Sequence, residues 1–109
     1  MKNLFEETVA VLNKNGKSIN DIIAVQGDDF AISVDNFVEV AKNTNYYSGY
    51  GHQEVACDLA IIGNGWWLER REYDGAEWWK FCSTPVVKTN IETVKTLSGD
   101  GWSSLKQMQ

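Results

Sequence analysis

The sequence predicts an α+β domain: an antiparallel sheet built on a three-stranded meander (57–83) plus an N-terminal hairpin, with two short helices packed on it. The first indication is that Asn64-Gly65 and Asp74-Gly75 are strong hairpin signals, because tight primed turns need positive φ at both central residues. The second is the aromatic and β-branched composition around both turns, which suits pleated strands. The third is a pair of helical apolar stripes in the N-terminal half of the chain.

The register of the meander follows if both turns are two-residue loops. Leu68 then lies between Ile61 and Phe81 on the neighbouring strands. One face collects the apolar side chains of Leu59, Ile61, Trp66, Leu68, Trp79 and Phe81. The other face is mixed and collects Asp58, Ala60, Ile62, Trp67, Glu69, Arg71, Trp78, Lys80 and Cys82. This division predicts a sheet that is buried on one side only.

Charged cross-strand pairs test this register. Asp58–Arg71 and Glu69–Lys80 are opposite-charge pairs and favour it. Glu72 opposite Glu77 argues against it. A second loop of four residues would remove that clash, and it would leave the two faces unchanged because both loop lengths are even.

The mixed face holds the first group of candidate binding residues, Trp67, Arg71 and Trp78. Tryptophan and arginine are frequent hot spots of protein interfaces, and arginine stacks on tryptophan. The alternative is that a helix covers this face and both tryptophans belong to the core. The sequence does not decide between the two.

The N-terminal half supplies the helices and the hairpin. Apolar residues at helical spacing predict a helix over 2–15, ended by Gly16. Residues 19–33 predict a hairpin with its turn at 27–29. A clean i, i+3, i+4, i+7 stripe predicts a second helix over 34–43, with Ser33 as its N-cap.

The stretch 43–56 is the second candidate site, because it is long for a connection inside a compact domain. It contains Tyr46, Tyr47, Tyr50 and His52 among Asn, Ser and Gly. This mixture is typical of binding loops, where tyrosine supplies rigid contact area and small residues supply adaptability. The alternative is a compact loop that packs on its own tyrosines.

Composition predicts one domain over 1–109 and disfavours direct binding to nucleic acid. The net charge is −5, and residues 1–65 hold nine acidic and four basic residues, whereas nucleic-acid binding relies on Lys and Arg. The N-terminal stretch lacks a small-residue cleavage site, and no apolar run could cross a bilayer. We therefore expect a cytoplasmic protein without a membrane partner. The two cysteines are expected to be unpaired, which fits a reducing compartment.

The sequence offers little support for catalysis. His52 is the single histidine, and no Cys or His spacing indicates a metal site. Neither the carboxylates near 69–77 nor a His52–Cys57 pair completes a nucleophile, base and stabiliser. We expect no enzyme, no cofactor and no metal.

The run GWWLERREYDGAEWWKF, with NYYSGYG before it and TLSGDGW after it, resembles small phage and prophage proteins of Gram-positive bacteria. The resemblance covers about residues 20–105 by pattern and is densest in the meander. It implies a context and assigns no catalytic residue. Small acidic phage accessory proteins often bind and disable a host factor, as anti-CRISPR proteins do.

The first hypothesis is therefore a non-catalytic phage accessory protein that binds and inhibits a host protein, such as a nucleic-acid-binding nuclease or another defence effector. Its contact surface would combine the Tyr46–His52 loop with the exposed part of the meander, chiefly Trp67, Arg71 and Trp78. Its acidic N-terminal half would meet a basic groove of the target. The second hypothesis is a small-ligand module that stacks a sugar or nucleobase on its aromatic side chains. The third is a homo-oligomeric structural or virion accessory protein whose Trp face joins the subunits.

Overall fold

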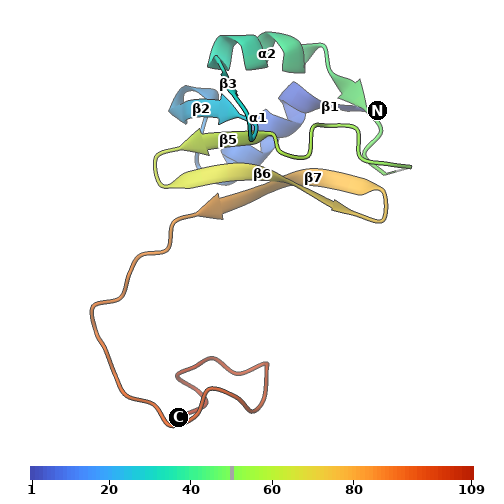
Figure 1. Ribbon diagram of the computed structural model, residues 1–109. Helices are drawn as coiled ribbons and strands as arrows, with labels where there is room; N and C mark the ends of the chain where they lie inside the picture. Colours follow the sequence, from blue (N-terminus) through green and yellow to red (C-terminus); the bar gives the residue numbers. More distant parts are fainter. Residues whose placement is uncertain (50) are drawn as a thin grey trace.

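The computed structural model describes residues 1–49 and 51–109 and has an α+β fold (Figure 1). Its elements are β1 (Lys2–Asn3), α1 (Leu4–Lys14), the 3₁₀ turn η1 (Ile19–Asp21), β2 (Ile22–Gln26), β3 (Ala31–Ile32), α2 (Val34–Lys42), β4 (Asn45–Tyr46), β5 (Ala60–Gly63), β6 (Trp66–Tyr73) and β7 (Ala76–Ser83). The predicted fold class is confirmed, including both helices and the N-terminal hairpin.

The main sheet has five antiparallel strands in the order β3-β2-β5-β6-β7. Both helices lie on one side of it (Figure 1). On that side Leu12 of α1 and Phe37 of α2 join Ile61 and Leu68 of the sheet in one buried apolar cluster. The indole N–H of Trp79 also donates to the Thr8 hydroxyl of α1 at 2.9 Å. The sheet is therefore buried on one side, as its pattern predicts.

The predicted meander register is confirmed. Leu68 pairs with Ile61 on β5 and with Phe81 on β7. The unfavourable pair Glu72–Glu77 is present as well, because Asp74-Gly75 is a two-residue loop. Asn64-Gly65 is also a two-residue loop. The loops differ from each other, however: Asp74 and Gly75 both have positive φ, whereas at Asn64-Gly65 only Gly65 does.

The predicted Asp58–Arg71 pair is wrong. The ladder between β5 and β6 ends at Ala60 and Glu69, so Asp58 lies outside the strand. Its carboxylate instead accepts the backbone N–H of Asp28 at 2.8 Å. Asp58 thus stabilises the turn between β2 and β3, where a carboxylate is a good acceptor for a turn amide.

Ser33 is the N-cap of α2, as predicted. The first helix begins at Leu4 and not at residue 2, and its N-cap is Asn3, which the sequence did not single out. The side-chain oxygens of Asn3 and Ser33 accept the backbone N–H of Glu6 and Asn36. Such caps satisfy N–H groups that have no partner within a helix. Asn3 also belongs to β1, which pairs with β4 in a two-stranded sheet that the sequence did not indicate.

The residues after β7 form an extended tail that leaves the folded part (Figure 1). Residues 84–109 contain no helix or strand. Several apolar side chains of the tail are largely exposed, including Val87 and Ile91. The packed elements therefore end at Ser83, within the single domain expected over 1–109.

Candidate binding surface

The sheet face turned away from the helices is the candidate binding surface, here called the open face. Side chains alternate between the two faces of a strand, so the confirmed register assigns its members. They include Ala24, Ala60, Ile62, Trp67, Glu69, Arg71, Trp78, Lys80 and Cys82. The mixed face of the predicted meander is thus not covered by α1 or α2, which answers the question that the sequence left open for Trp67 and Trp78.

An apolar row crosses the open face. Ala24 pairs with Ile62, Ile62 with Trp67, and Trp67 with Cys82 on four successive strands. Ile62, Trp67 and Cys82 are half-buried although no helix lies over them. Cross-strand neighbours of this kind bury part of each other's surface, so the row forms a continuous apolar strip.

Glu69 connects this strip to the charged side chains beside it. Its Oε1 accepts the indole N–H of Trp67 at 3.0 Å and the thiol of Cys82 at 3.1 Å. Its Oε2 lies 3.2 Å from Nη2 of Arg71. The predicted Glu69–Lys80 cross-strand pair is present in the register, while the ion pair of Glu69 is with Arg71. One carboxylate therefore positions three side chains of the surface.

The contact between Glu69 and Cys82 shifts their pKa values in opposite directions. The hydrogen bond from Cys82, followed by that from Trp67, lowers the pKa of Glu69. Burial, followed by the hydrogen bond to Glu69, raises the pKa of Cys82. At neutral pH the thiol is therefore kept protonated as a donor and the carboxylate ionised as an acceptor.

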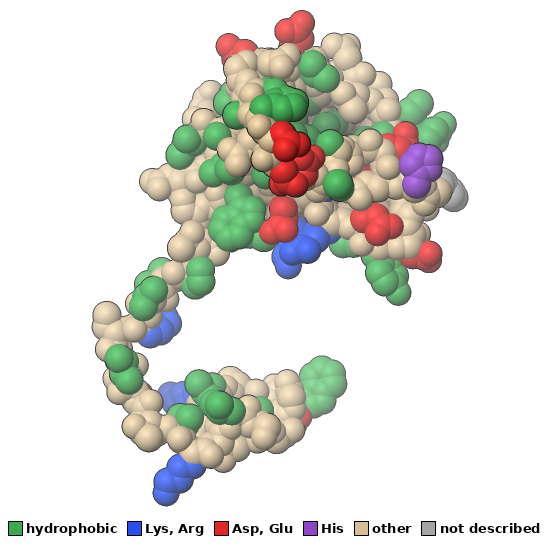
Figure 2. All heavy atoms as spheres, viewed as in Figure 1, with side chains coloured by type: hydrophobic (Ala, Val, Ile, Leu, Met, Phe, Trp, Pro, Cys, Tyr) green, Lys and Arg blue, Asp and Glu red, His purple; other side chains and the backbone are tan. Residues whose placement is uncertain are grey.

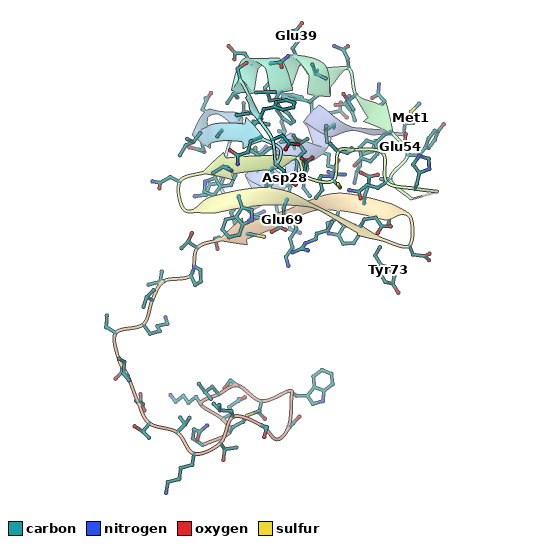
Figure 3. All side chains as sticks on the ribbon, viewed as in Figure 1. Met1, Asp28, Glu39, Glu54, Glu69 and Tyr73 are labelled. Carbon is teal, nitrogen blue, oxygen red and sulfur yellow. The ribbon has the colours of Figure 1, made fainter. Side chains whose placement is uncertain are left out.

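The outer members of the surface are accessible. Trp78 is 39% exposed and the Arg71 side chain 48% exposed. They are directly opposite each other on β6 and β7. Figure 3 labels Glu69 in the middle of the meander and Tyr73 at the tip of the β6–β7 hairpin. The open face thus presents two tryptophans and an arginine on rigid strands, the residue types most enriched at interface hot spots.

Tyr46, expected in the binding loop, is instead a core residue. It lies in β4 and is 2% exposed. Its hydroxyl donates to Glu7 and accepts from Nη2 of Arg70 at 3.1 Å. The Arg70 guanidinium lies between the rings of Tyr46 and Trp79, at 5.6 and 4.7 Å from their centroids. Tyr46 therefore cannot contact a partner in this fold.

Arg70 is the centre of a buried polar cluster that the sequence did not identify. Its side chain is fully buried and forms ion pairs with Glu77 at 2.8 Å and Glu7 at 3.3 Å. One signal was available: the predicted register points Arg70 to the apolar face, and a buried cation requires partners. The same cluster resolves the Glu72–Glu77 clash, because Glu77 is neutralised by Arg70 while Glu72 remains at the surface.

Glu77 also anchors the stretch 43–56, here called the tyrosine loop. Its carboxylate accepts the backbone N–H groups of Glu54 at 2.7 Å and Val55 at 3.2 Å. Its own backbone N–H donates to the carbonyl of Ser48 at 3.0 Å. The loop is thus fixed at both ends to β7, on the helix side of the sheet and along its edge.

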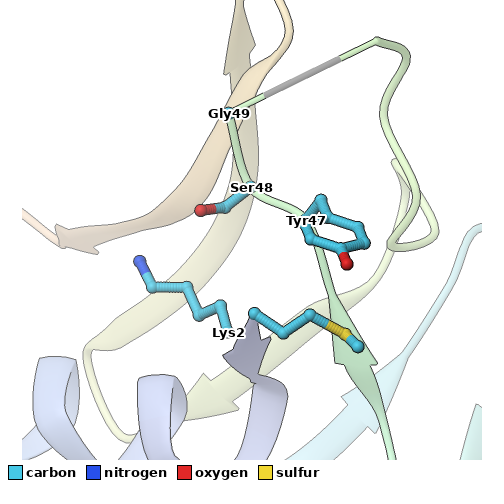
Figure 4. Close-up of a pocket in the computed structure, with 5 residues that line it drawn as sticks. Lys2, Tyr47, Ser48 and Gly49 are labelled. Carbon is cyan, nitrogen blue, oxygen red and sulfur yellow. The ribbon is translucent and has the colours of Figure 1, made fainter.

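The exposed loop residues form a separate surface. Tyr47 is 55% exposed and, with Lys2 and Ser48, lines a pocket of about 460 Å³ (Figure 4). His52 is exposed and lines a second pocket of about 290 Å³ with Tyr47. Tyr50 lies outside the described residues. Since the side chains of Glu77 and Trp78 point to opposite faces of β7, the loop and the open face do not join into the single surface that the sequence suggested.

Comparison with protein-family models, with curated proteins and with solved structures finds no match. In the described part of the chain no group of three or more His, Cys, Asp or Glu side chains is arranged to hold a metal ion. Nor is any helix of residues 1–49 and 51–109 long and apolar enough to span a bilayer. Cys57 and Cys82 are both free thiols.

Proposed function

We propose that this protein is a non-catalytic binding module of phage or prophage origin that recognises and inhibits a host protein through its open face. The observation that carries the proposal is the Glu69 arrangement, in which one carboxylate holds Trp67 and Arg71 in place on an uncovered face. Aromatic and arginine side chains fixed before binding lose little entropy on association, which favours affinity.

The host context rests on the resemblance of the GWWLER…YDG…EWW run to phage and prophage proteins. Inhibition of a defence effector in the host cytoplasm follows from the same context. The charge of the protein supports a target with a basic groove, such as a nuclease. Residues 1–83 hold thirteen acidic and seven basic residues, and acidic side chains occur over the folded part in Figure 2. Complementary charge accelerates and orients such an encounter.

The experiment is capture of a partner from a Gram-positive host lysate with the tagged full chain, followed by affinity measurement with the purified partner. Two variants test the open face: Trp78→Ala and Arg71→Glu. Their matched controls are Trp102→Ala and Lys106→Glu, which change the same residue types in the exposed tail. We expect each open-face variant to weaken binding by more than about 30-fold, as the loss of a hot spot does, and the controls to bind like the wild type.

Three results would contradict the proposal. If no specific protein is captured from the lysate, the protein has no host partner of the proposed kind. If the Trp78→Ala and Arg71→Glu variants bind with the same affinity as the wild type, the open face is not the binding surface. Loss of binding in Tyr47→Ala alone would transfer the contact to the tyrosine loop. If the partner has a basic groove, its affinity should also be lower at about 500 mM salt than at about 50 mM, because salt screens charges that lie farther apart than the Debye length.

A further inference from the structure

The outer edge of β7 has backbone groups without a partner strand. β7 is the last strand of the sheet, and its Glu77 N–H points outward to Ser48, whereas the Thr84 N–H points inward to the carbonyl of Gly65 at 2.8 Å. Antiparallel ladders alternate inward and outward groups. Trp79 and Phe81 therefore direct their N–H and C=O groups outward, and no backbone group of the described chain pairs with them on that side.

A groove runs between this edge and helix α1. It has a volume of about 260 Å³ and is lined by Lys2, Glu7, Ala10, Val11, Lys14, Trp78 and Trp79. Ala10 and Val11 supply an apolar wall. The Glu7 carboxylate is already bonded to Arg70 and Tyr46. A free strand edge beside a helix-lined groove is the geometry that binds an extended segment by strand addition.

The tail contains a segment suited to this edge. Residues 85–97 are rich in Val, Ile and Thr, which favour strands. Val87 and Ile91 are 86% and 91% exposed, so the tail leaves large apolar side chains in water. In an extended strand Val87, Ile91 and Leu97 share one side, and Glu92 lies on the other.

We propose that residues 85–97 of a second copy of this chain add as a strand to the outer edge of β7. The side with Val87 and Ile91 faces the groove along α1. The side with Glu92 faces the open face, where Lys80 offers the opposite charge. Overall charge supports the exchange, since residues 84–109 hold three basic and two acidic residues and the folded part is acidic.

The donor is a second copy because the tail of the same copy leads away from the groove. Figure 1 shows it leaving the end of β7 and remaining apart from the folded elements. Residues 84–89 contain no Gly, Asn or Asp, the residues that favour a two-residue reversal next to a strand. Reciprocal exchange between two copies covers the β7 edge of each and closes a two-fold dimer.

Light scattering on the full chain tests the proposal over about 1 μM to about 1 mM, the range that covers moderate and weak association. The wild type is expected to approach twice the 12.3 kDa mass of one chain. Ala10→Arg fills the groove, and Ile91→Asp removes the apolar anchor from the tail. Each should raise the dissociation constant at least about tenfold. Asn13→Arg, exposed on α1 outside the groove, is the matched control for Ala10→Arg.

Amide hydrogen exchange on the same samples identifies the edge. We expect protection of the Trp79 and Phe81 amides to increase with concentration in the wild type and to stay constant in Ile91→Asp. A wild type that is monomeric throughout overturns the proposal. So does a dimer that survives either variant, or one that forms without protecting these amides. Ile91→Asp lies in the exposed tail, so its result holds even if Ala10→Arg disturbs the fold. Trp78 lines the groove and also belongs to the open face, but neither variant changes it, Trp67 or Arg71. This test therefore fails or succeeds separately from host binding.

Discussion

Arg70 and Glu77 form an ion pair of 2.8 Å in which neither side chain is exposed to solvent. Glu7 and Tyr46 also bind the guanidinium, through Nη1 and Nη2, so the pair connects α1 and β4 to the meander. Removing one member of a buried pair leaves the other as an uncompensated charge, which costs far more than the loss of a surface ion pair.

We therefore expect Arg70→Met to lower the free energy of unfolding by about 3–5 kcal/mol. Its neighbour provides the control, because Arg71 is half exposed and Arg71→Met should cost less than about 1 kcal/mol. Urea denaturation followed by tryptophan fluorescence measures both. Similar losses for the two variants would contradict the central position of Arg70.

Tyr46 predicts a loss of stability at alkaline pH. Burial, followed by the hydrogen bond to Glu7, raises its pKa from 10.0 to about 12. The folded state therefore holds the phenol proton more tightly than the unfolded state. This contribution is complete below pH 10 and is lost as the pH rises to about 12.

The measurement is urea denaturation across that interval for the wild type and Tyr46→Phe. The wild type should lose stability more steeply, by up to about 1.4 kcal/mol per pH unit. Groups that titrate in both proteins affect both free energies of unfolding alike, so their contribution cancels in the difference between the wild type and Tyr46→Phe. A difference that does not change with pH would show that Tyr46 is not protected in this way.

Cys82 should react slowly with alkylating reagents. Its pKa is raised by burial and by Glu69, and the reactive species is the thiolate. We expect slower modification by iodoacetamide in Cys57→Ser, where Cys82 is the remaining thiol, than in Cys82→Ser, where the exposed Cys57 remains. Adding Glu69→Gln to Cys57→Ser should accelerate the reaction, whereas Glu72→Gln should not. Faster reaction of Cys82 than of Cys57 would contradict the contact with Glu69.

Gly63 is required because the Trp66 ring lies against it. A Cβ atom added at Gly63 would be 2.0–2.3 Å from three atoms of that ring, and the ring is itself stacked on Phe81. Gly63→Ala is expected to destabilise the fold by at least about 1–3 kcal/mol, the usual cost of overpacking. Gly101→Ala is the control, since nothing lies within 4 Å of its added Cβ, and thermal unfolding measures both. If the Gly63→Ala protein were as stable as the wild type, the Trp66 ring would be able to shift without loss of stability, which would contradict the prediction.

The sequence predicted the meander and its register because both depend on local chemistry, namely two turns and alternating side chains. It could not assign Tyr46, because a tyrosine in a polar loop and a tyrosine paired with a buried arginine look alike without knowledge of Arg70. It also joined the loop to the open face, whereas Glu77 holds the loop on the other side of the sheet. The side chains of Glu77 and Trp78 point to opposite faces of β7, which separates the loop from the open face. The sequence could not show this, because it did not indicate that the loop binds Glu77.

The tandem tryptophans Trp66-Trp67 and Trp78-Trp79 have one member in the core and one on the open face. A shift of one residue would exchange the members of each pair, and tryptophan would still fill the core position. The aromatic side chains thus tolerate two registers and select neither. The register is instead selected by Asp74-Gly75, whose geometry fixes the loop length, and by the ion pair of Arg70 with Glu77, which forms in only one alignment. A single residue inserted between Asp74 and Gly75 would consequently produce a misaligned hairpin with an intact aromatic pattern, a folding error that hydrophobicity alone would not correct.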